Sequence, residues 1–265
     1  MSYLLDLRNM LVSWGVSESI QCPTRYRGAV GRFNKEDDRA RAKAGIGASE
    51  LGTILGGWKT INDWVTERVR DQPGANITQR FGRAQKDFAR EEHQRVQGGF
   101  IHRFKSNTTE GRDGIYVHPE GQWFAGKPAR WELWFGLASN IGFLSHSRQT
   151  PEGWVGSEPP MDIYVQSQVA MGLMEWDMVR ITCVFRATNP VTVFHGSIVF
   201  CPDFWHECRR AAWFILHMLE GARNGTTPAI DSPRQPIPAP TVRALTHESN
   251  EALQLVSAYL RTRNT

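Results

Sequence analysis

Residues 161–200, MDIYVQSQVAMGLMEWDMVRITCVFRATNPVTVFHGSIVF, decide the fold class of this chain. The preceding pair Pro159-Pro160 predicts the start of a helix over about 161–175, because proline is tolerated before or at the first helical turn. Two apolar strands are predicted next, at about 178–187 and 191–200, with the turn residues Thr188-Asn189-Pro190 between them. A helix that leads into a pair of strands indicates a sheet covered by helices.

The segments on either side extend this pattern. Amphipathic spacing and glycine or proline stops predict helices at 49–55, 60–71, 78–97 and 203–222. Short apolar runs between turn residues predict strands at 100–104, 115–118, 122–125 and 141–144. Helices, then strands, then a helix, a strand pair and a helix give a layered α/β fold.

Length and composition are those of a globular protein. The chain has 265 residues, of which 40% are hydrophobic and 22% charged. No apolar run approaches the ~20 residues that span a bilayer, and the N-terminus lacks the pattern of a signal peptide. Four scattered cysteines fit a reducing compartment, so we expect a cytoplasmic protein, in the host cell if the chain is viral.

The chain divides into three predicted parts. Residues 1–44 form a basic N-terminal arm, which is either solvated or in contact with phosphate, and 45–223 form the core domain. Residues 224–265 combine a proline-rich linker with a final helix over 246–262. The net charge is +4 and the pI about 9.0, which is compatible with nucleic acid as a partner without requiring it.

Five motifs occur in a fixed order along the core. They are Gly45-Ile46-Gly47-Ala48-Ser49, Gly82-Arg83-Ala84-Gln85-Lys86, Trp123-Phe124-Ala125-Gly126-Lys127-Pro128-Ala129, Gly142-Phe143-Leu144-Ser145-His146-Ser147 and Tyr164-Val165-Gln166-Ser167-Gln168-Val169-Ala170-Met171. Together they resemble the YqaJ-type viral recombinases, the family of phage lambda exonuclease, which are PD-(D/E)XK nucleases. The resemblance covers about residues 40–235. It implies a restriction-endonuclease-like fold, in which helices flank a central mixed sheet.

The resemblance also predicts that the catalytic centre is degenerate. The family places a glutamate, an aspartate and a Glu-x-Lys pair at positions that here correspond to Lys86, Ala129, Ser145 and Ser147. Magnesium takes oxygen ligands, often one or two carboxylates with phosphate and water, and it activates a bound water. None of the four residues supplies a carboxylate. We therefore expect no metal, no cofactor and no nuclease activity at these positions.

A centre that loses carboxylates and gains a lysine should attract phosphate directly. The candidate contacts are the basic, hydroxyl and amide residues of the motifs and of the arm: Arg41, Lys43, Ser49, Lys86, Lys127, Arg130, Gln166 and Gln168. Two of these roles have structural alternatives. Ser49 is most simply a helix N-cap, and the two glutamines, two positions apart on a helix, cannot share a face.

The sequence leaves open both the identity of the metal ligands and the function. If the metal ligands are relocated, Asp113 and Glu120 are the fallback pair for magnesium, although both lie beside glycine and fit turns equally well. The expected function is an inactive exonuclease-like protein, of phage or prophage type, that binds DNA or a recombination partner. The alternatives are a protein-binding scaffold, virion component or inhibitor, and an active magnesium-dependent exonuclease. The resemblance also implies a homotrimeric ring, and no membrane.

Overall fold

The computed structural model of the 265-residue chain describes most of the predicted core. The described residues are 3–28, 30–32, 45–69, 78–104, 109–127, 140–148, 150–151, 153–154, 158–188 and 192–226. Except for residues 224–226, the predicted linker and C-terminal helix lie outside these ranges, as does the arm segment 33–44. No helix in the described part is both long enough and apolar enough to cross a membrane.

A five-stranded mixed sheet forms the centre of the molecule. Its strands, in spatial order, are β3 (Phe100–Arg103), β6 (Gly121–Phe124), β7 (Ile141–Arg148), β8 (Met178–Phe185) and β9 (Thr192–Val199). Neighbouring strands are antiparallel except β7 and β8, which are parallel. A parallel pair needs a crossover connection, and helix α7 (Met161–Met174) lies in that connection. The predicted class, α/β with a central mixed sheet flanked by helices, is confirmed.

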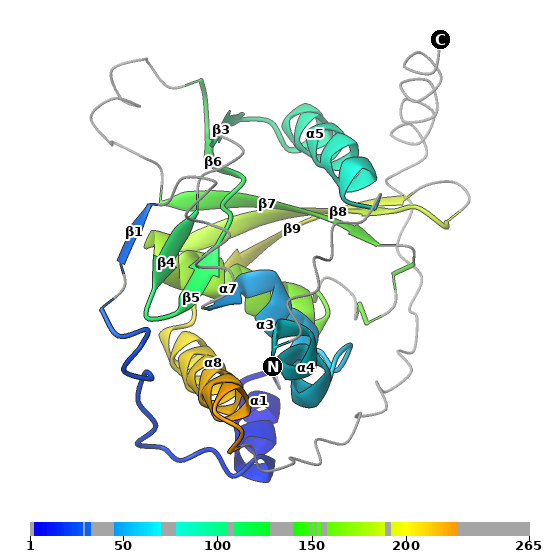
Figure 1. Cartoon of the computed structure of the whole chain (residues 1–265). Coiled ribbons are helices and arrows are strands. Elements are labelled where there is room, and N and C mark those ends of the chain that lie inside the picture. Colours follow the sequence, from blue (N-terminus) through cyan, green and yellow to red (C-terminus); the bar gives the residue numbers. More distant parts are fainter. Residues whose placement is uncertain are drawn as a thin grey trace.

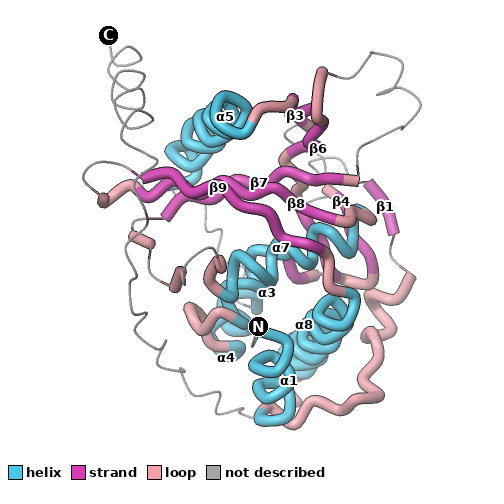
Figure 2. The backbone as a smooth tube through the Cα atoms, turned by 180° about the vertical axis from the view of Figure 1, so that it is seen from behind, coloured by secondary structure: helices cyan, strands magenta, loops and turns pink. Residues whose placement is uncertain are grey.

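Helices cover both faces of this sheet. Helix α5 (Thr78–Gln97) lies on one face, whereas α7 and α3 (Ala48–Leu55) lie on the other (Figure 1). Beyond them, on the same side, lie three more helices: α4 (Ile61–Val69), α8 (Pro202–Arg223) and α1 (Tyr3–Ser13). The view from behind shows the same layers (Figure 2).

A second, smaller sheet stands beside the first. Its strand order is β1 (Val30–Arg32), β4 (Glu110–Arg112), β5 (Ile115–Val117) and β2 (Ile46–Gly47). Strand β2 runs parallel to β5 and leads directly into α3, so this sheet fixes the point at which the helix begins.

The core lies between the central sheet and the helices α3, α7 and α8. Glycine allows α3 to approach α7 closely, because a Cβ atom at Gly52 would lie 2.5 Å from the backbone oxygen of Asp162. Residues of α7 such as Ile163 and Val169 are completely buried. Full burial of such side chains is worth about 1.5–3 kcal/mol each, which makes α7 a central stabilising element.

The N-terminal segment is not an arm throughout. Residues 3–13 form α1, whose Leu7 and Leu11 are buried in the core, and Arg8 donates to Glu207 of α8 at 3.0 Å. The basic residues that suggested an arm come later in the segment. The apolar residues before them form the buried face of a helix. This burial holds the start of the segment against the core, although the segment as a whole is basic.

Candidate functional site

Three side chains from separate elements meet at one side of the central sheet. Lys86 comes from α5, Glu120 stands just before β6, and Ser145 lies in β7. The ammonium group of Lys86 donates to Oε1 of Glu120. The backbone N–H and the hydroxyl of Ser145 both donate to Oε2 of the same carboxylate, at 2.8 and 2.5 Å. We call this group the Lys86–Glu120–Ser145 cluster.

Strand alternation explains which helix the cluster faces. Side chains two apart on a strand point to the same face. Phe143 of β7 packs edge-on against His93 of α5, with ring centres 5.2 Å apart. Ser145 and Ser147 therefore lie on the α5 face as well, one and two pleats further along. The two-residue spacing of these serines therefore places both on the same face of β7.

The cluster does not have the composition of a magnesium site. Glu120 is its one carboxylate, and both oxygens already accept hydrogen bonds from Lys86 and Ser145. Within the described ranges, no group of three or more His, Cys, Asp or Glu side chains could hold a metal ion. Magnesium needs near-octahedral oxygen ligands. The residues of this cluster therefore do not fit the metal that the family resemblance implies.

The two fallback ligands lie in different places. Glu120 belongs to the cluster, whereas Asp113 occupies the turn between β4 and β5 in the smaller sheet. Asp113 has a positive φ of 52° and accepts the backbone N–H of Gly28 at 2.9 Å, so it is a turn residue. Ala129, placed by the motif register at the aspartate position, lies outside the described residues.

The residue between the two serines is a half-buried histidine, His146. Burial, together with the charges of Arg148 and Lys86, lowers the pKa of His146 to about 3. Its Nε2 atom and the hydroxyl of Ser147 are buried without a hydrogen-bond partner among the described residues. His146 is therefore neutral near pH 7, and this part of β7 carries polar atoms that the described protein leaves unsatisfied.

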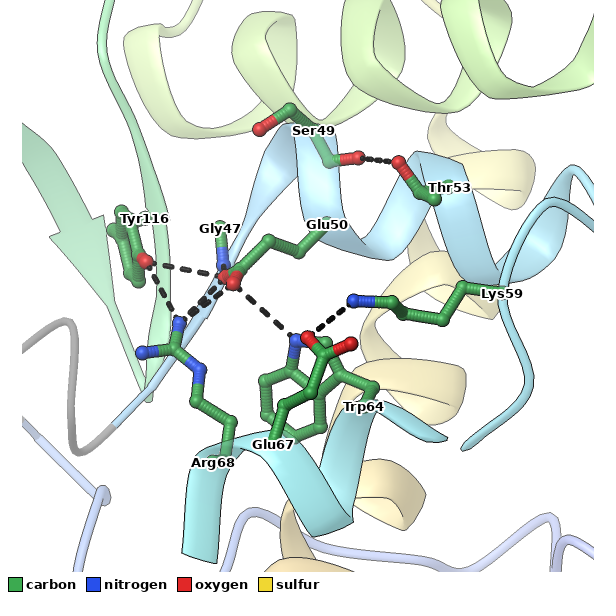
Figure 3. Close-up of polar contacts among 9 residues, drawn as sticks. All are labelled: Gly47, Ser49, Glu50, Thr53, Lys59, Trp64, Glu67, Arg68 and Tyr116. Atoms are coloured by element: carbon green, nitrogen blue, oxygen red, sulfur yellow. Dashed lines mark hydrogen bonds and ion pairs between the residues drawn. The ribbon is translucent and has the colours of Figure 1, made fainter. Parts of the chain in front are cut away.

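Ser49 lies at the start of α3 but does not cap the helix. The N-cap is Gly47, whose backbone N–H donates to Oε2 of Glu50 at 2.8 Å. The Ser49 side chain is exposed, and its carbonyl accepts the hydroxyl of Thr53 at 2.7 Å (Figure 3). The prediction of a serine N-cap was wrong by two residues, because Glu50 reaches back to the preceding backbone.

Glu50 is the centre of a hydrogen-bonded group at this helix start (Figure 3). Arg68 donates to both carboxylate oxygens at 2.7 Å, Trp64 donates at 3.3 Å and Tyr116 at 3.1 Å. Burial raises the pKa of the Tyr116 hydroxyl, and the Glu50 charge raises it further, so Tyr116 remains a donor. The carboxylate of Glu50 thus occupies the anion position at the N-terminus of α3, and the group is structural.

The other predicted contacts are dispersed. Gln168 is buried and structural, since its amide donates to the Val199 carbonyl at 2.8 Å and accepts from the Cys201 N–H at 2.8 Å. Gln166 is half-buried on another face of α7, and Lys127 is exposed after β6. Arg41, Lys43 and Arg130 lie outside the described residues.

The described fold and site define a mixed α/β protein with one carboxylate, one lysine and one serine gathered beside its central sheet. No family model and no curated protein matches the chain. A crystal structure of an alkaline exonuclease (LHK-Exo) from Laribacter hongkongensis is similar, with 13% identity and a TM-score of 0.47, over 72% of this chain and 95% of that chain. The structure of LHK-Exo in complex with dAMP gives 14% identity and a TM-score of 0.47, over 70% and 93%.

Proposed function

We propose that this chain binds phosphate groups of nucleic acid at the Lys86–Glu120–Ser145 cluster and does not hydrolyse them. One observation carries this proposal: an ammonium group, a backbone N–H and a hydroxyl converge on a single anionic group. Charge-assisted donors of these kinds are the ones that proteins use for phosphate oxygens. The carboxylate of Glu120 occupies the place that a phosphate would take.

The charges at the cluster favour binding over catalysis. Where the family resemblance implies three carboxylates and a lysine, the cluster offers Glu120 alone, opposite the ammonium group of Lys86. A lysine at this place attracts a phosphate without the help of a metal. Its ammonium group cannot act as a metal ligand. Binding of this kind is electrostatic and weakens with salt.

Access to phosphate depends on an exchange of partners. The Lys86 side chain is 52% exposed and that of Glu120 only 16%, so the lysine can turn toward solvent while the carboxylate stays in place. Glu120 then competes with phosphate for the same donors. Removing its charge should therefore tighten nucleic acid binding rather than abolish it.

Fluorescence anisotropy with labelled duplex DNA over a range of salt concentrations tests the proposal. Lys86→Glu should weaken binding by about tenfold, because a charge-assisted contact is worth about 1.5–3 kcal/mol before screening. It should also reduce the slope of log K against log salt by about 1. Arg112→Glu is the matched control, since Arg112 is 50% exposed, forms an ion pair with Glu175 and lies in the smaller sheet.

Glu120→Gln separates binding from catalysis. If the proposal is right, this variant binds DNA more tightly than the original chain, and neither protein digests linear DNA with Mg²⁺ or Mn²⁺. Metal-dependent digestion that Glu120→Gln abolishes would establish a working nuclease with Glu120 as a ligand. If the original chain does not bind DNA even at low salt, the proposal that it binds phosphate is refuted.

A further inference from the structure

An exposed tryptophan and an arginine lie together where β7 ends. Trp58, in the turn between α3 and α4, has 49% of its surface exposed. The guanidinium of Arg148, the last residue of β7, lies 5.7 Å from the centre of its ring. Among the described residues that expose large apolar side chains, Trp58 is the aromatic one, and the others are leucine and valines. The guanidinium thus lies over one face of the ring, and about half of the tryptophan is accessible from solvent.

The turn holds the indole ring in place. The backbone N–H groups of Trp58 and Lys59 both donate to the Thr53 carbonyl, at 3.0 and 3.3 Å. A Cβ atom at Gly56 would lie 3.2 Å from Cδ1 of Trp58, so the ring rests against the glycine backbone. A ring that is already ordered loses little conformational entropy when a ligand binds.

Arg148 is also fixed in position and has donors to spare. Its guanidinium pairs with Oδ2 of Asp162, a side chain of which only 9% is exposed. A guanidinium carries five N–H donors, and this pair uses few of them. On the same face of β7, Oδ1 of Asp162 is buried without a partner among the described residues. Unsatisfied buried polar groups call for a specific explanation, and a bound ligand is one.

We propose that Trp58 and Arg148 form a site for an unpaired nucleobase and its phosphate, so that the ligand is a single-stranded nucleic acid or a frayed end. Sites for single strands combine aromatic rings, on which bases stack, with cations along the backbone. Within a duplex both faces of a base are covered by its neighbours, so a base must be unpaired or terminal to stack on an indole. The inference rests on the proposed function and makes its ligand more specific.

The new site and the phosphate cluster share strand β7. Ser145 and Arg148 are three residues apart on β7, which at about 3.3 Å per residue is about 10 Å. They lie on opposite faces of the strand, since Arg148 pairs with α7 and Ser145 faces α5. The two sites are therefore on opposite sides of β7, and a single strand would contact both only by passing around the end of β7.

Three labelled ligands of equal length test this inference by anisotropy: a single-stranded thymine oligonucleotide, an abasic single strand and a duplex. Trp58→Leu should weaken binding of the thymine strand about tenfold, because one stacked base contributes about 1–3 kcal/mol. It should leave the abasic strand and the duplex unchanged, and Trp58→Phe should retain most of the affinity. Trp213→Leu is the matched control, since Trp213 also lies beside an arginine, Arg209, at 4.7 Å on α8.

The outcomes distinguish this inference from the proposed function. If Trp58→Leu has no effect on the thymine strand, or weakens the abasic strand equally, base stacking at Trp58 is refuted. An equal loss in Trp213→Leu also refutes it, provided that circular dichroism shows both variants folded. If Lys86→Glu weakens all three ligands while Trp58→Leu affects none, the phosphate cluster stands without the base site. If the original chain binds none of them, both proposals fail.

Discussion

A buried histidine, His93, should make the stability of this protein depend on pH. His93 of α5, only 1% exposed, lies 2.8 Å from the hydroxyl of Thr182 through Nδ1. The same hydroxyl lies 3.1 Å from Nδ1 of His195 in β9. Burial, together with the neighbouring His195 and the charge of Arg180, lowers the pKa of His93 from its ordinary 6.5 to about 4.

The size of the effect follows from this difference. Between about pH 6.5 and pH 4 the unfolded chain binds a proton at His93 that the folded chain does not, so stability falls as the pH falls. A difference of about 2.5 in pKa, at 1.36 kcal/mol for each, corresponds to about 3 kcal/mol. The loss is complete near pH 4, and above pH 6.5 the histidine contributes no pH dependence.

Urea denaturation of the original chain and of His93→Gln, at a series of pH values, measures this directly. The variant loses packing at all pH values, but its free energy of unfolding should fall by about 3 kcal/mol less between pH 7 and pH 4. His146, whose pKa is about 3, contributes equally to both proteins. His206→Gln, which removes an imidazole from an exposed position of α8, is the control substitution. Parallel curves for the original chain and His93→Gln would refute the reasoning.

Two further substitutions test the packing of the fold. Glu50→Gln keeps the shape of the side chain but leaves Arg68, only 19% exposed, without a counter-charge. The free energy of unfolding, measured by urea denaturation, should therefore fall by about 2 kcal/mol. A fall of less than about 0.5 kcal/mol would mean that the ion pair behaves as an exposed one. Gly142→Ala would place a Cβ atom 2.0 Å from the ring of Trp176, so the free energy of unfolding should fall by about 3 kcal/mol. If thermal melting shows no loss for Gly142→Ala, or if adding Trp176→Leu recovers none of it, the close contact is not the cause.

Much of the fold follows from local sequence signals. The helix predicted at 161–175 is observed as Met161–Met174, and the strands predicted near 178–187 and 191–200 are Met178–Phe185 and Thr192–Val199. Prolines and turn residues mark these boundaries. The smaller sheet was harder to foresee, because β4 consists of Glu110–Arg112, a segment without apolar alternation. Its pairing with β1 and β5 depends on distant partners that no local pattern reveals.

The site was predicted in part. The motifs indicated Lys86 and Ser145, which the structure brings together through Glu120, a residue that the sequence offered only as a fallback. Which carboxylate faces β7 depends on the register between β6 and β7, in which Gly121 pairs with Phe143. A long connection separates these strands, and spacing along the sequence cannot fix their register.

The pairing of Trp58 with Arg148 had no signal in the sequence. The two residues are far apart along the sequence, and neither belongs to a recognisable motif in its own segment. Their contact depends on the close approach of α3 to α7, which the glycines of α3 permit. A search for exposed aromatic residues near the ends of central strands requires coordinates.

Because β7 lies between β6 and β8, it delivers alternate side chains to two separate surfaces. Ser145 serves the surface below α5, and Arg148, an odd number of positions later, serves the opposite one. A single inserted residue between them would reverse the orientation of everything beyond it. Substitutions along this strand can therefore change one surface at a time. An insertion or deletion of one residue between Ser145 and Arg148 would instead misplace the side chains of one of the two surfaces.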